Sequence, residues 1–171
     1  MPCALTKGFP LDCKDAVGGV VEIKIKAFST TNIADFVPQT DGSVTIATAS
    51  ETGWYKYELN KEDGTLEEKL IAPVANRTVS YEQTLKFSLF NLSKDKQTEL
   101  RLVAQNRLWI AVKTASGTCW LLGYNLGADL VESNATSGKS LQDKNGYELT
   151  FSCKSIIPML DCTAEYDNLV Q

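Results

Sequence analysis

The chain contains no histidine, the residue that most often serves as general base and metal ligand in enzymes. Its five cysteines are Cys3, Cys13, Cys119, Cys153 and Cys162, and no two of them form a C-x-x-C pair. The sequence therefore excludes Ser-His-Asp and Cys-His catalytic arrangements, together with most zinc sites. We expect no catalytic residue, no metal ligand and no cofactor-binding residue.

The odd number of cysteines favours buried or half-buried free thiols in a reducing compartment. A Cys3–Cys13 or a Cys153–Cys162 disulfide is the alternative. The first residues lack a charged leader followed by an apolar core, and no run of about 18 apolar residues occurs. These two observations predict a chain that is made in the cytoplasm and does not enter a membrane.

One stretch contains fragments of two kinds of binding site. Gly138, Lys139 and Ser140 resemble the end of a phosphate-binding loop, but Ser133 stands where that motif needs its first glycine, so we expect no phosphate cradle. Three carboxylates could be proposed as a cation site: Asp129, Glu132 and Asp143. Their irregular spacing in an Asn- and Ser-rich segment instead predicts solvated turn residues.

Aromatic residues could stack on nucleic-acid bases or sugars. Those in strand-like segments are Trp54, Tyr55, Tyr57, Trp109, Trp120 and Tyr124. Aromatics on strands are more often core or subunit-contact residues, and we predict that role. A carbohydrate-binding module would require at least two of the three tryptophans to be exposed on one face.

The charge of the chain disfavours a nucleic-acid-binding surface, since the net charge is -4 and the isoelectric point about 4.9. The basic residues nearest to a cluster are Lys94, Lys96 and Arg101. We predict that this group, and Lys24 with Lys26, belong to solvated faces.

The strongest periodic signal lies in residues 79–89, where apolar and polar residues alternate as in a half-buried strand. Residues 93–106 predict one short helix, with Ser93 as N-cap, Asp95 in the first turn and Asn106 at the end. Its apolar side comprises Leu100, Val103 and Ala104. Residues 108–114 and 119–124 then have the spacing of a β-hairpin.

Other segments extend this β-rich pattern. Residues 21–27 and 147–153 alternate, the first with a charged outer face, and residues 44–48 have β character. Residues 54–59 and 65–72 flank a turn that ends in Asp63 and Gly64, which predicts a second hairpin. Residues 30–42 and 125–143 read as loops. The whole chain, residues 1–171, is predicted to form one mainly β domain.

Two stretches carry a resemblance to a known family. Residues 120–151 read WLLGYNLGADLVESNATSGKSLQDKNGYELTF, and residues 3–19 contain C-x-L-T-K-G-F-x-L-D-C-K-D-x-x-G-G. Both resemble virion structural proteins of tailed bacteriophages, in particular tail-tube or tail-ring proteins of phages of Bacteroidetes-group bacteria, crAss-like phages among them. The resemblance implies an antiparallel β-sandwich or barrel with one flanking helix, assembled into a ring.

The first hypothesis is therefore a structural subunit of a symmetric homo-oligomeric ring, most simply a hexamer, in a phage tail or neck. Adjacent tail, neck or portal-side virion proteins would be its partners, and DNA would pass through the lumen without specific binding. A capsid decoration or baseplate protein is the alternative, followed by a carbohydrate-binding module. Residues 1–19 and 155–171 have apolar residues without a period and are predicted to be assembly arms.

Overall fold

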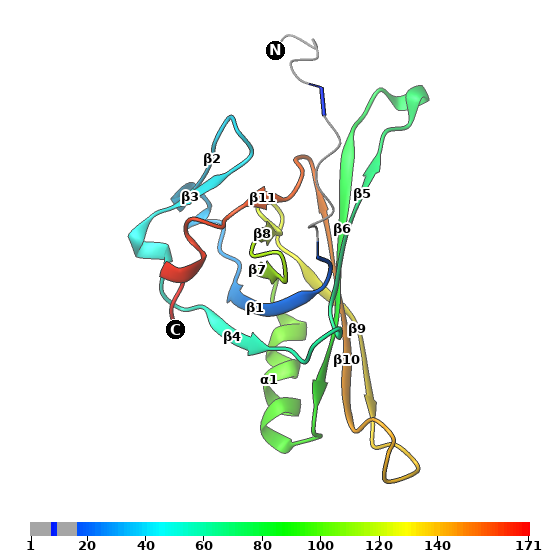
Figure 1. Ribbon diagram of the computed structural model, residues 1–171. Helices are drawn as coiled ribbons and strands as arrows, with labels where there is room; N and C mark the ends of the chain where they lie inside the picture. The colour runs from blue at the N-terminus through cyan, green and yellow to red at the C-terminus, as the bar shows by residue number, and fades with distance from the viewer. Residues whose placement is uncertain (1–7, 10–16) are drawn as a thin grey trace.

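The computed structural model describes residues 8–9 and 17–171 of the chain. This part is mainly β and contains one α-helix and two antiparallel sheets that pack against each other (Figure 1). Neither sheet closes on itself. The prediction of an antiparallel β-sandwich or barrel with one flanking helix is thus confirmed, in its sandwich-like form.

The five-stranded sheet has the order β11-β8-β7-β1-β4. Its strands are β11 (Leu160–Asp161), β8 (Cys119–Leu122), β7 (Leu108–Thr114), β1 (Val20–Ala27) and β4 (Tyr55–Glu58). The four-stranded sheet has the order β5-β6-β10-β9. Its strands are β5 (Thr65–Ile71), β6 (Ser80–Phe90), β10 (Gly146–Ser155) and β9 (Asp129–Thr136). A small hairpin of β2 (Phe36–Pro38) and β3 (Val44–Ile46) completes the strands of the described residues.

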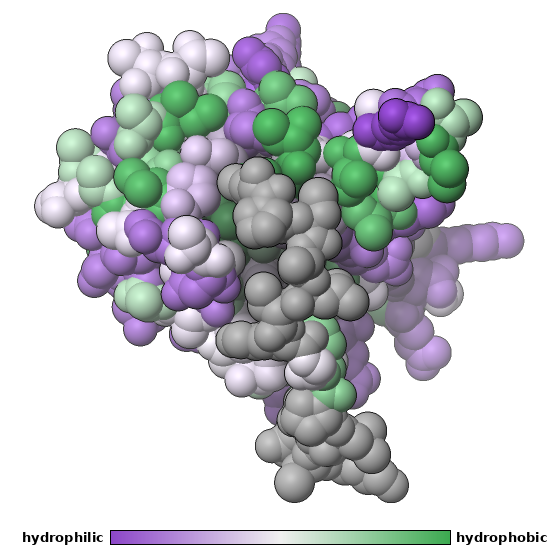
Figure 2. All heavy atoms as spheres, turned by 90° about the horizontal axis from the view of Figure 1, so that it is seen from above, coloured by the Kyte–Doolittle hydropathy of each residue, from purple (hydrophilic) through white to green (hydrophobic). Residues whose placement is uncertain are grey.

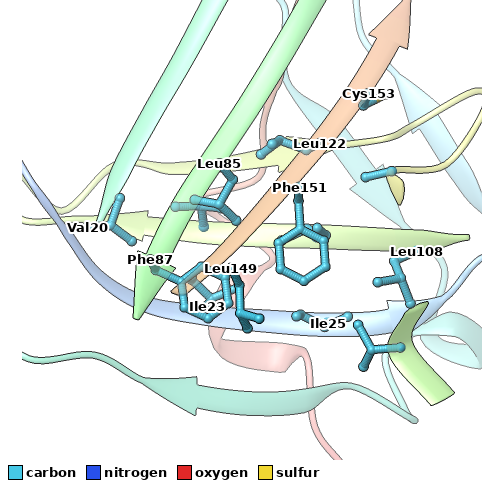
Figure 3. Close-up of a cluster of buried hydrophobic side chains, with 14 of the residues drawn as sticks. Val20, Ile23, Ile25, Leu85, Phe87, Leu108, Leu122, Leu149, Phe151 and Cys153 are labelled. Carbon is cyan, nitrogen blue, oxygen red and sulfur yellow. The ribbon is translucent and has the colours of Figure 1, made fainter. Parts of the chain in front are cut away.

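The main core lies between the two sheets. From the four-stranded sheet come Leu85, Phe87, Leu149 and Phe151, and from the five-stranded sheet come Ile23, Ile25, Ile110 and Val112. In Figure 3, Leu85, Phe87, Leu149 and Phe151 of one sheet lie against Ile23 and Ile25 of the other. The rings of Phe87 and Phe151 stack with centroids 5.6 Å apart. The predicted alternation of β6 and β10 is confirmed because their apolar positions fill this layer.

The helix α1 (Lys94–Gln105) flanks the sandwich and begins where the sequence predicted. The Ser93 side chain accepts a hydrogen bond from the Lys96 amide at 3.2 Å, which satisfies one of the unpaired amides of the first turn. Leu100 and Val103 are buried against the main core, whereas Ala104 is exposed. The predicted apolar side is therefore right except for Ala104.

A second core covers the other face of the five-stranded sheet. It contains Trp109 and Ala111 of β7, Leu121 of β8, the β2–β3 hairpin and Trp54. The C-terminal segment adds four buried side chains to this second core: Leu160, Cys162, Tyr166 and Leu169. β7 is consequently buried on both faces, which explains its uninterrupted apolar run from Leu108 to Val112.

Lys24 on β1 corrects the prediction of a charged, solvated outer face. Its side chain is buried under the C-terminal segment, and its Nζ donates to the main-chain oxygens of Tyr166 at 2.8 Å and Leu169 at 2.9 Å. Nζ also lies 4.3 Å from the centroid of the Tyr166 ring. A lysine can alternate with apolar residues and still be buried when carbonyl groups replace its water.

The C-terminal segment likewise differs from the predicted assembly arm at 155–171. Ser155 ends β10, and Leu160, Cys162, Tyr166 and Leu169 are buried in the chain's own second core. These four side chains need no neighbouring subunit to cover them, because the outer face of the five-stranded sheet does so. The other predicted arm, residues 1–19, lies largely outside the described residues.

The predicted hairpin of residues 54–59 and 65–72 is wrong, because its two strands belong to different sheets. β4 pairs with β1, and β5 pairs with β6. The chain crosses between the sheets at Gly64, where a Cβ would come within 2.7 Å of the Val20 Cβ. The positive φ of the connection falls on Glu62 at 62°, so Asp63-Gly64 does not form a hairpin turn.

Residues 125–143 also differ from the prediction, since they contain the strand β9 rather than only loop. β9 pairs along β10 from Gly146 to Ser152, with a bulge between Thr150 and Phe151. Most of its side chains are exposed and only Leu130 packs against the main core. An edge strand of this kind has no buried face to impose a periodic apolar pattern.

Removing the Lys24 ammonium should destabilise the protein. In a Lys24→Met variant, the Tyr166 and Leu169 oxygens lose a charged donor while they stay covered. We expect the free energy of unfolding to fall by on the order of 2–3 kcal/mol. Urea denaturation measures this, with Lys154→Met, an exposed lysine on β10, as the matched control. Equal stability of the two variants would show that Lys24 does not hold the C-terminal segment.

Candidate functional site

The fragments of binding motifs in residues 129–143 serve the local turn. The Asp143 Oδ2 accepts hydrogen bonds from the amides of Ser140 at 2.7 Å and Lys139 at 2.8 Å. These bonds hold the pKa of Asp143 below its usual range. The amides that a phosphate would need are thus already bound to a carboxylate, and the predicted turn role of Asp143 is confirmed.

The described residues contain no group of three carboxylates or cysteines placed to hold a metal ion. Asp129 and Glu132 are exposed on β9, in a different element from Asp143. The alternative of a cation site at these three residues therefore has no geometric support in the part of the chain that the structure describes.

Two of the three tryptophans, Trp54 and Trp109, are core residues, so the tryptophans do not form a stacking platform. Trp54 and Trp109 are 1% and 0% exposed, and Trp120 is half-buried. The Trp54 Nε1 donates to the Ser50 oxygen at 2.9 Å, and that of Trp109 to the Tyr124 oxygen at 3.1 Å. Two exposed tryptophans on one face, which a carbohydrate-binding platform would require, are not present. Of the six aromatic residues singled out in the sequence, Tyr55 is the exposed one.

The three cysteines in the described residues are buried free thiols, as predicted. Cys153 and Cys162 are not joined, so the alternative of a disulfide between them is wrong. Burial raises the pKa of both Cys119 and Cys153 to about 11. Burial raises the pKa of Cys162 even more. Cys3 and Cys13 lie outside the described residues.

The strongest candidate for a functional surface is the four-stranded sheet, because neither of its edges pairs with a strand in the part of the chain that the structure describes. The Asn91 amide donates to the Asn145 oxygen at 2.8 Å. In an antiparallel pair every second residue bonds to the same neighbour, so the odd-numbered residues of β10 bond to β6 and the even-numbered ones to β9. Ser133 and Ala135 of β9 lie opposite Leu149 and Tyr147, which bond to β6. Their own main-chain amides and carbonyls therefore point away from β10.

The same alternation applies to the other edge. It points the main-chain polar groups of Leu66, Glu68 and Leu70 away from β6. No strand of the described chain lies beside either edge. The site is therefore two rows of main-chain amides and carbonyls, on β5 and on β9, that no other strand of the described residues pairs.

The edges of the two sheets differ in how they are protected. β11 has only two residues, and on β4 the Lys56 Nζ forms ion pairs with Glu22 at 2.8 Å and Glu58 at 3.0 Å. Short strands and edge lysines discourage pairing with another chain. β9 has eight residues and contains neither lysine nor proline. β5 has seven residues and carries Lys69 with two glutamates, so β9 is the less protected edge of the four-stranded sheet and the one most open to strand addition.

The outer face of the four-stranded sheet is also uncovered, and it is mostly polar. The cross-strand register places on it Glu67, Lys69, Glu82, Thr84, Lys86, Asp129, Glu132, Asn134, Glu148, Thr150, Ser152 and Lys154. Two exposed apolar residues, Ile71 and Phe90, lie on the same face toward opposite ends of β6. Four glutamates, one aspartate and three lysines thus share a face with small polar residues. Such a face can border water without presenting an apolar patch or a strong positive field.

No protein-family profile, no curated protein and no solved structure matches the chain. Within the described residues, no helix combines the length and the apolar character needed to cross a membrane.

The buried thiols should be unreactive in the folded protein. With a pKa of about 11, Cys119 and Cys153 are thiolate in only about one molecule in a thousand at pH 8. In a Cys3→Ser/Cys13→Ser variant, Ellman's reagent should modify none of the thiols within minutes, and all three after guanidinium unfolding. Fast modification of the folded variant would contradict the burial of these residues.

Proposed function

We propose that this protein is a structural subunit of a tailed-bacteriophage virion that closes into a ring, in a tail tube or a related tail or neck ring. The observation that carries the proposal is the pair of unpaired edges on the four-stranded sheet. The resemblance of residues 3–19 and 120–151 to tail-tube and tail-ring proteins supports the same conclusion.

The strand directions are compatible with a ring. The sheet has an even number of strands and each neighbouring pair is antiparallel, so β5 and β9 run in opposite directions. In a ring whose axis follows the strands, every copy points the same way. β9 of one copy would then lie antiparallel to β5 of the next, and the alternation would continue across the boundary.

The shape of the subunit determines which face would line the lumen. The five-stranded sheet and α1 cover one side of the four-stranded sheet, as Figure 1 shows, and they occupy more room than the bare side. A closed ring would therefore carry them outside and turn the polar face inward. With four glutamates and one aspartate against three lysines, that face would let DNA pass without gripping its phosphates.

The remaining parts of the proposal follow from the resemblance. The ring would be a homo-oligomer of six copies, in contact with adjacent tail, neck or portal-side proteins. The protein would be made in the cytoplasm of the bacterial host and would end in the virion. Its role would be architectural and would involve neither catalysis nor a cofactor.

Blocking one edge should abolish the ring and spare the subunit. A Ser133→Pro variant removes an amide that points away from β10 and places the proline ring on the open edge. We expect rings of the unmodified protein in mass photometry and negative-stain images, and monomers of the variant. Because no bond to β10 is lost, the free energy of unfolding should change by less than about 1 kcal/mol.

Asn134→Pro is the matched control, since by the same alternation its amide bonds to β10. This variant should be clearly less stable than Ser133→Pro. Rings of Ser133→Pro that match those of the unmodified protein would contradict closure through β9, and an unmodified protein that stays monomeric at all concentrations would contradict the ring itself.

The position in the particle gives a further prediction. In virions separated into heads and tails, mass spectrometry should find this protein with the tails, in a copy number that is a multiple of the ring size. Its recovery with isolated heads and absence from tails would instead identify a capsid decoration protein.

A further inference from the structure

The β5–β6 hairpin carries an apolar tip that neither core cluster of the described residues includes. The hairpin extends beyond the rest of the molecule at one end (Figure 1), and hydrophobic residues gather on it when the molecule is seen from that end (Figure 2). We call residues 70–79 the hairpin tip. Val74 is 92% exposed, and Leu70 and Val79 are more than half exposed. A contiguous apolar surface of this kind marks an interaction site.

The tip has a defined shape. Pro73 precedes a short 3-10 turn, Val74–Asn76, and the Asn76 amide donates to the Pro73 oxygen at 3.2 Å. Arg77 then takes a left-handed conformation, with φ 51° and ψ 35°, and the chain enters β6. The turn therefore presents Val74 and Arg77 from a closed loop, which lowers the entropy cost of docking them.

A complementary groove lies between β4 and α1. Its volume is about 130 Å³ and its apolar lining includes Ile25, Tyr57 and Leu108. Tyr55 and Leu102 stand at its sides, each 49% exposed. Cavities of about 150 Å³ accept a benzene-sized ligand, so this groove has room for one branched side chain.

Charge complements shape in this pair of surfaces. Arg77 gives the tip a positive charge, and Glu99 of α1 lines the groove. Within the described residues, neither side chain forms an ion pair. The tip and the groove cannot meet in one molecule, because the tip projects at one end while α1 and β4 lie toward the other (Figure 1).

We propose that the hairpin tip of one copy docks into the β4–α1 groove of a second copy, with Val74 in the groove and Arg77 beside Glu99. This contact is heterologous, so each copy offers a tip to one neighbour and a groove to the other. It runs along the strand direction and would stack one ring on the next. The stacking of rings therefore rests on the proposed ring, whereas the contact between one tip and one groove can form between two copies without a ring.

Disulfide trapping between two variants, each with one added surface cysteine beside the three buried native ones, tests the contact. Val74→Cys and Leu102→Cys are made separately in a background with Cys3→Ser, Cys13→Ser and Ser133→Pro, so that lateral closure is blocked. After mild oxidation, the mixture should yield a covalent dimer that neither variant yields alone. Replacing Leu102→Cys by Arg101→Cys, on the same helix but outside the groove, should reduce the yield severalfold.

Charge reversal then tests the specific pairing. Arg77→Glu in the Val74→Cys copy should lower the dimer yield severalfold, and Glu99→Arg in the Leu102→Cys copy should restore it. Absence of the mixed dimer, or equal yields with Leu102→Cys and Arg101→Cys, would overturn the docking proposal. These outcomes are independent of the ring, whose failure would appear as the absence of closed rings from the protein with Ser133 intact.

Discussion

The burial of β1 on both faces is the constraint on which the rest of the structure depends. One face supplies Ile23 and Ile25 to the core between the sheets, and the other places Lys24 beneath the C-terminal segment. Burial lowers the pKa of Lys24, and Glu22 opposes this effect. The ammonium stays compatible with burial because two main-chain oxygens and the face of Tyr166 replace its water. One interaction thus joins the first strand to the last residues of the chain.

Sequence patterns predicted the elements whose burial is one-sided. β6 and β10 alternate because one face of each meets the core, and α1 follows from its Ser93 cap and the spacing of Leu100 and Val103. Patterns failed where tertiary packing decides. Lys24 was predicted to be solvated because no pattern in the neighbouring residues indicates that a segment 142 residues away covers it. β9 looked like loop because an edge strand needs no apolar period. The candidate site was not predicted from the sequence, because an open edge depends on how the strands are ordered in the sheet and not on any single residue.

The sandwich divides its tasks between the two sheets. The five-stranded sheet is covered on both faces and ends in a two-residue strand and an ion-paired one, so it builds the stable body. The four-stranded sheet packs with one face only and leaves a polar face, two long edges and a projecting hairpin. Strand edges left free over seven and eight residues are a liability for an isolated subunit. In a closed ring the same groups would pair, which turns the liability into the contact that defines the assembly.

Amide hydrogen exchange in the assembled protein and in the Ser133→Pro monomer tests this account most directly, because it reports on individual edge residues. Pairing between β5 and β9 predicts that the amides of Glu68, Leu70 and Ala135 exchange quickly in the monomer and slowly in the assembly. Amides that already bond within the sheet, such as that of Thr84, should be protected in both. Edge amides that exchange equally fast in the assembly and the monomer would contradict closure through this sheet.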